Sequence, residues 1–157
     1  MVRDKRYKRL IIISRLLFVA YMVFALYFLL FAETFGRGSI NRGYSYNLEL
    51  FREIRRYMEW SSKSQLGMKM MFLNIWGNII IFMPFGFFIP TVVKKAKNIV
   101  IVTILSFVFS VSVEVTQLLT KAGSFDVDDL LLNTIGGAIG YILYVAAKKW
   151  LLGRNKN

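Results

Sequence analysis

Four long runs of apolar residues divide the chain, and each is close to the length of a membrane-spanning helix. The runs are Leu16–Ala32, Ile75–Val93, Ile99–Leu119 and Leu130–Ala147. A helix needs ~20 apolar residues to cross ~30 Å of hydrocarbon. The pattern therefore predicts an all-α integral membrane protein. We expect one domain, a bundle of four transmembrane helices with spans at about 10–32, 74–93, 99–119 and 127–147.

The largest segment outside these runs is a loop at about 33–73. Within it, apolar residues recur at helical spacing up to Met58, with charged residues on the other faces. Asn47 is a residue type that favours helix N-caps, so we expect a loop helix to begin there. An amphipathic helix that carries arginines is typical of a segment lying in the membrane interface, although packing on the bundle alone is an alternative.

The charge pattern predicts the orientation of the bundle. The net charge is +12, and 13 of the 21 basic residues lie in the two terminal segments and the turn at 94–98, which share one side of a four-span bundle. Short basic segments mark the cytoplasmic side, so we expect a multi-pass protein of the cell membrane with both termini cytoplasmic. The first run is too long for a signal peptide and has no small-residue cleavage site after it, which favours a retained anchor. Basic residues spread over several loops do not indicate a nucleic-acid partner.

Polar side chains enter the last three spans at one depth, near the ends that we expect to face outward. Because such groups are costly in hydrocarbon, we expect them to face the bundle interior and form a shared pocket open to the outside. The carboxylate of Glu114 also needs a partner, such as Lys121 or a loop arginine, a proton or water. The sequence has no Cys and no His, so any chemistry must use carboxylates, amides, hydroxyls, Lys, Arg or Tyr. The polar residues are Asn74, Asn78, Glu114, Gln117, Asp126, Asp129 and Asn133.

Structural roles are open alternatives for some of these residues. Asp126 has the position of an N-cap for the fourth span. Asn74 and Asn78 are suited to hydrogen bonds between helices. Asp128 lies off the polar stripe, and we expect it to be solvated or to lie in the membrane interface. Further along the fourth span, Gly136-x-x-x-Gly140 permits the close approach of another helix, including that of a second copy in a dimer.

Several segments together resemble the VanZ-like family. Residues 74–86 resemble its N-x-x-G-N-x-x-x-F-x-P-F-G motif, residues 114–117 its E-x-x-Q, and residues 125–140 its F-D-x-x-D-x-x-x-N-x-x-G-x-x-x-G block. Asn47-Leu48 and Phe51 are similar to its N-L-x-P-F segment. The resemblance implies an integral membrane protein associated with resistance to teicoplanin, a glycopeptide that carries a lipid.

The chain departs from the family pattern at two places. The family often has an arginine shortly before the F-D pair, where this chain has residues 122–124, Ala-Gly-Ser. If that arginine supplies a cation to the carboxylates, Lys121 is the nearest replacement here. Leu50 stands where the family usually has proline.

Two functions fit these residues. The first is binding of an amphipathic molecule in the outer leaflet, either a membrane lipid, a lipid-linked cell-wall precursor or the lipoglycopeptide. The second is a membrane-embedded enzyme, in which Glu114 acts as general base while Asp126 and Asp129 hold a divalent cation, with Glu114 as a further ligand. A transporter fits less well, because the inner halves of the last three spans carry no polar residues beyond hydroxyls. The ligand-binding candidates are Asn47, Phe51, Asn74, Asn78, Gln117 and Asn133.

Overall fold

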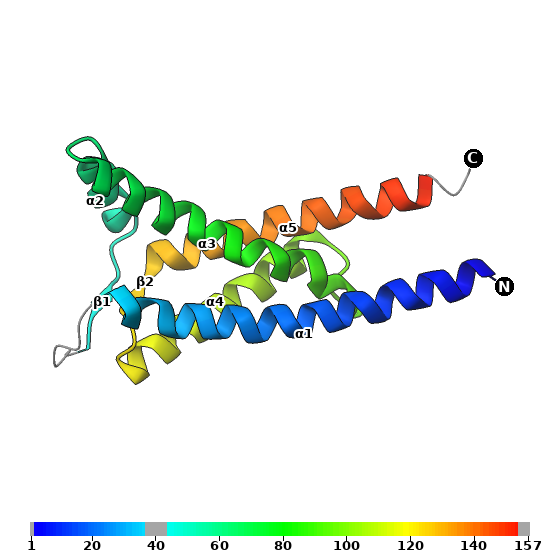
Figure 1. Ribbon diagram of the computed structural model, residues 1–157. Helices are drawn as coiled ribbons and strands as arrows, with labels where there is room; N and C mark the ends of the chain where they lie inside the picture. The colour runs from blue at the N-terminus through cyan, green and yellow to red at the C-terminus, as the bar shows by residue number, and fades with distance from the viewer. Residues whose placement is uncertain (1, 37–43, 154–157) are drawn as a thin grey trace.

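The four apolar runs form four long helices in the computed structural model. The structure describes residues 2–36 and 44–153, with side chains for 9–29 and 44–151. The long helices are α1 (Val2–Gly36), α3 (Gln65–Val92), α4 (Ile99–Thr120) and α5 (Val127–Gly153). Each contains a stretch long and apolar enough to cross a membrane. The predicted all-α membrane bundle is confirmed, as Figure 1 shows.

The two ends of the bundle differ. The start of α1 and the end of α5 lie at one end (Figure 1). The α3–α4 turn lies toward the same end, where the Tyr141 hydroxyl donates to the Lys97 carbonyl at 2.6 Å. The opposite end carries the short helix α2 (Arg52–Ser61) and the strands β1 (Tyr46–Asn47) and β2 (Phe125–Asp126) (Figure 1). We call this the α2 end.

The loop helix begins later than expected. The structure starts α2 at Arg52, so Asn47 is not its N-cap. Asn47 instead pairs with Asp126 in a parallel, two-residue contact between β1 and β2. The partner of Asn47 is therefore 79 positions away in the chain. The local N-cap preference of asparagine does not decide the role of Asn47, because its place in the fold is set by this long-range pairing.

The helix α3 begins at Gln65, well before the expected start at residue 74. The Ser64 hydroxyl accepts a hydrogen bond from the Gly67 amide at 2.9 Å and caps the helix. Gly67 lies directly against α2, since a methyl group at this position would lie 2.3 Å from the carbonyl oxygen of Trp60. The apolar run did not predict this extension of α3 toward Gln65. The polar residues there interrupt an apolar run but are compatible with a helix.

Glycines let α3 and α5 pack closely. A methyl group on Gly86 would lie 1.8 Å from the Gly137 carbonyl oxygen, and one on Gly140 would lie 1.9 Å from that of Met83. Gly136 meets the backbone of Ile79 in the same way. The Gly136/Gly140 face is therefore buried against α3 within the chain, and it offers no free surface for the dimer that its spacing suggested.

Aromatic side chains fill the centre of the bundle. The rings of Phe85 and Phe109 stack at 4.9 Å, with Phe82 fully buried beside them. Tyr21 of α1 donates to the Ile81 carbonyl at 2.7 Å, close to Pro84, whose ring disturbs the hydrogen bonds of the preceding turn. This bond ties α1 to α3 near its internal proline.

Candidate functional site

The first turn of α5 is the centre of the polar network at the α2 end. The Asp126 side chain accepts a hydrogen bond from the Asp128 amide at 2.8 Å, so Asp126 caps α5 as one of the sequence interpretations proposed. Its same oxygen accepts from the side-chain amide of Asn47 at 3.1 Å. Asp126 therefore starts α5 and holds the loop segment before α2.

Glu114 reaches the same turn from α4. Its side chain is only 2% exposed, and its Oε2 atom accepts the backbone amide of Asp126 at 3.0 Å. The expected cationic partner Lys121 lies elsewhere, with its ammonium 5.1 Å from the centre of the Tyr44 ring. Oε2 of this carboxylate therefore binds a backbone N–H group at the N-terminal end of α5.

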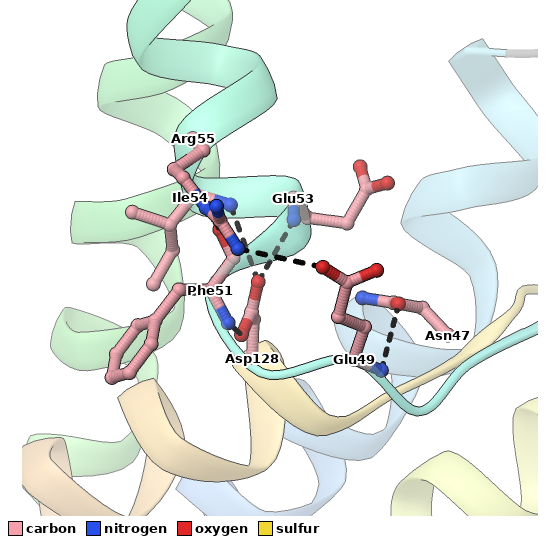
Figure 2. A network of polar contacts seen from close by, with 7 residues as sticks. All are labelled: Asn47, Glu49, Phe51, Glu53, Ile54, Arg55 and Asp128. Atoms are coloured by element: carbon pink, nitrogen blue, oxygen red, sulfur yellow. Dashed lines mark hydrogen bonds and ion pairs between the residues drawn. The ribbon is translucent and has the colours of Figure 1, made fainter.

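Asp128 does not lie where the sequence predicted. It is completely buried instead of solvated, and it accepts hydrogen bonds from the amides of Phe51, Glu53 and Ile54, the latter two at 2.9 and 3.2 Å. Figure 2 shows the carboxylate directed at the start of α2. The signal for this role was the lack of a capping side chain on α2: Phe51 occupies its N-cap and has no oxygen to offer.

Phe51 adopts an unusual backbone conformation at this junction. Its φ of 66° is in the left-handed region, which a bulky residue rarely occupies. The Asp128 hydrogen bond holds its amide while the ring is 48% exposed, and Figure 2 shows the ring pointing away from the polar contacts. Arg55 closes the same turn through the Phe51 carbonyl and the Glu49 carboxylate. The candidate ligand contact Phe51 is thus presented outward by a fixed backbone.

A side-chain amide of α3 contacts a third carboxylate of α5. Asn78 donates from its side chain to Oδ1 of Asp129, which joins the two helices as the structural alternative proposed. Asn74 lies one turn nearer the α2 end on the same face. Its Oδ1 atom is buried, and no donor among the described residues reaches it.

The two remaining polar candidates bind other helices. Gln117 donates from its side chain to the Leu29 carbonyl of α1 at 2.7 Å, and Asn133 donates to the Ser110 hydroxyl of α4 at 2.9 Å. Both are buried. Of the seven predicted residues, four are buried (Glu114, Gln117, Asp126 and Asn133) and three are part-buried (Asn74, Asn78 and Asp129). The hydrogen bonds described for them join different pairs of helices, and the shared open pocket stays a prediction.

The surroundings of Asp126, where α2 meets the start of α5, raise the pKa of its carboxyl group. Burial raises the pKa of Asp126 above its usual range, against the lowering effects of the Asp128 amide, the Asn47 side chain and the charge of Arg56. Within the described parts of the chain, no three Asp or Glu side chains gather closely enough to hold a metal ion. The cation site expected from Asp126, Asp129 and Glu114 therefore finds no support in this arrangement.

The helix α2 presents cations beside apolar side chains. Tyr57 is its buried residue, whereas Arg52, Arg55 and Met58 are exposed. Trp60 at its end is 40% exposed. Such a mixture suits the boundary between water and lipid, where tryptophan and arginine both find favourable surroundings.

These features define the class of the protein: it is a small multi-pass membrane protein whose four long helices carry a buried polar network at one end. Residues 18–149 match the model of the VanZ/LLP1 family, and the chain belongs to that family. Protein VanZ of Enterococcus faecium is 33% identical over 75 residues, an alignment that covers 46% of this chain and 44% of that protein. The chain therefore spans less than half the length of this curated relative. No solved structure is similar to the chain.

Proposed function

We propose that this protein contributes to resistance against glycopeptides such as teicoplanin by binding an amphipathic molecule in the outer leaflet. The ligand is either the lipoglycopeptide itself or a lipid-linked cell-wall precursor. Membership of the VanZ/LLP1 family and the similarity to Protein VanZ support this role.

The observation that carries the proposal is the anchoring of α2 by buried carboxylates. Asp128 of α5 holds the start of α2, and Asp126 holds Asn47 in the segment before it. The helix packs on α3 at its other end, where Gly67 meets Trp60. An amphipathic helix fixed at both ends offers a preorganised surface for an amphipathic ligand, and preorganisation reduces the entropic cost of binding.

The proposal includes an orientation. The start of α1, the end of α5 and the α3–α4 turn lie at the end opposite α2. In the sequence, the two terminal segments and this turn carry most of the basic residues. The positive-inside rule supports a cytoplasmic location for that end, which puts α2 in or near the outer leaflet. Labelling of single cysteines from outside intact cells tests this, since the natural chain has none.

The contacts support binding over catalysis. A general base needs a carboxylate atom within reach of a substrate proton. Here Oε2 of Glu114 accepts the Asp126 amide, and both oxygens of Asp128 accept amides of the α2 segment. These groups hold backbone in place, which suits a binding surface.

Complementation tests the proposal. Wild type, Glu114→Gln and Asp129→Asn are expressed at matched membrane levels in a susceptible Gram-positive host, and teicoplanin susceptibility is measured. The matched control is Ser112→Ala, because Ser112 is exposed on α4 and its hydroxyl contacts only its own helix at Val108. We expect both carboxylate variants to lose protection and the control to keep it. If both variants protect as well as wild type, the polar network is only structural and the proposal fails.

A further inference from the structure

An apolar groove lies between α3 and α5, beside the close contact between Gly140 and the Met83 carbonyl. Its volume is about 330 Å³. Ile80 is 55% exposed and Leu143 is 45% exposed, so the groove opens to the surface of the bundle. We call it the α3–α5 groove, and it is lined by Ile80, Met83, Pro84, Phe87, Phe88 and Leu143.

The α3–α5 groove lies in the half of the bundle farther from α2. Pro84 precedes the last residue of α3 by eight positions, which is ~12 Å along the helix, and half of the hydrocarbon thickness is ~15 Å. From Ile80 to Phe88 the groove follows α3 for ~12 Å. Its walls are therefore within the hydrocarbon of one leaflet, where an apolar groove of this length suits a lipid acyl chain.

A lysine lies close to the end of the groove. The ring of Phe87, which lines the groove, meets the ring of Tyr144 edge to face, with 6.2 Å between their centres. The ammonium of Lys148 lies 5.9 Å from the centre of the Tyr144 ring. Lys148 is exposed, and an ammonium has three N–H donors, so its contact with the ring leaves donors for a phosphate.

The end of the bundle around Lys148 is strongly cationic. In the sequence, the segments 1–15, 94–98 and 148–157 contain 13 basic residues and one acidic residue, Asp4. The exposed lysines of this end are Lys94, Lys95, Lys97, Lys148 and Lys149. None of them forms an ion pair with an acidic side chain of residues 9–29 or 44–151. Such a cluster favours a lipid headgroup with a net negative charge.

We propose that the α3–α5 groove and Lys148 bind one anionic phospholipid, with an acyl chain in the groove and the phosphate at the ammonium. The site is at the end opposite α2, so the inference goes beyond the proposed function. A helix from a second copy is the competing occupant. A second copy in the same membrane orientation would bring its own basic end to this position, where like charges repel, whereas an anionic lipid neutralises them.

Native mass spectrometry of the purified full chain in a neutral detergent counts the bound lipids and the copies of the chain. Phosphatidylglycerol is the test lipid. Phosphatidylcholine with identical acyl chains is its control, because it has the same phosphate group but no net charge. We expect one tightly bound phosphatidylglycerol per chain, with an affinity at least about fivefold higher than that of phosphatidylcholine, since one lysine near an anionic headgroup contributes about that factor.

Two variants test the two parts of the site. Lys148→Gln should weaken phosphatidylglycerol binding about fivefold and leave phosphatidylcholine binding unchanged. Its control is Lys69→Gln, which removes an exposed lysine near the α2 end of α3. Leu143→Trp enlarges a side chain in the wall of the groove and should weaken the binding of both lipids. Its control is Ile142→Trp, at an exposed position of the same helix outside the groove lining.

Each part of the proposal has a result that would overturn it. Equal affinities for the two lipids, or equal effects of Lys148→Gln and Lys69→Gln, would rule out the headgroup contact. Equal effects of Leu143→Trp and Ile142→Trp would rule out the groove. A chain that is dimeric without lipid and monomeric as Leu143→Trp would assign the groove to a second copy. Lys148 is exposed near the end of α5, so its variant keeps the test decisive if Leu143→Trp does not fold.

Discussion

Replacing Asp128 by alanine should detach the start of α2 from the bundle. The substitution removes the acceptor for three backbone amides, those of Phe51, Glu53 and Ile54. Hydrogen bonds to a charged group contribute about 1.5–3 kcal/mol each, and loss of a helix cap costs about 0.5–2 kcal/mol. Water can reach these part-buried amides once α2 moves, so we expect a local loss of about 2–4 kcal/mol.

Amide hydrogen exchange of the protein in detergent measures this loss at the residues concerned. A local loss of this size should speed exchange at residues 53 and 54 by about 30-fold to 1,000-fold, with the centres of α3 and α5 unchanged. Ser62→Ala is the control, because its hydroxyl bonds only the Glu59 carbonyl at the other end of α2. Unchanged exchange at residues 53 and 54 in Asp128→Ala would refute the capping role.

Two further predictions concern packing and pH. Gly86→Ala should destabilise the bundle by about 1–3 kcal/mol or more, because its methyl group would overlap the Gly137 carbonyl, whereas Gly77→Ala should be neutral or slightly stabilising; equal melting temperatures in detergent would contradict this. Burial raises the pKa of Asp126 above its ordinary 3.8, so the folded protein holds this proton more tightly than the unfolded chain. The stability that Asp126 contributes by binding this proton is fully present below pH 3.8 and is lost as the pH rises through the raised pKa. Wild type should therefore gain stability relative to Asp126→Asn when the pH falls from about 7 to about 4. An unchanged difference between the two melting temperatures would argue against this protonation.

The long helices could be predicted because their signal is contained in single segments. An apolar run of sufficient length forms a helix in a membrane whatever its neighbours are, since its backbone must satisfy its own hydrogen bonds there. The predicted first residues of α2 and α3 were wrong, because the observed ones depend on contacts between segments far apart in the chain. Asn47 is drawn into a pairing with Asp126, and Gly67 continues α3 by packing against α2.

The sequence predicted that residues of the site would be buried, but it did not predict their hydrogen-bond partners. Burial of Glu114 and Asn133 follows from their place inside apolar runs, and the structure confirms it. Their partners depend on how helices are rotated and which loop backbone lies nearby, and neither follows from residue spacing. The role of Asp128 was missed for this reason, because its donors lie about 75 residues earlier in the chain.

The buried carboxylates of this chain accept backbone N–H groups, in a sequence that lacks the arginine that the family often has before the F-D pair. Residues 122–124 offer no cation, and Lys121 contacts Tyr44. Backbone amides bind these acids: Asp128 binds the N-terminal amides of α2, while Asp126 and Glu114 bind amides at the start of α5. Helix N-termini carry partial positive charge, so two of them meeting at one point can stabilise several carboxylates. The same hydrogen bonds therefore fix the start of α2 and stabilise the buried Asp128 carboxylate, so a change in the position of α2 also changes the surroundings of this acid.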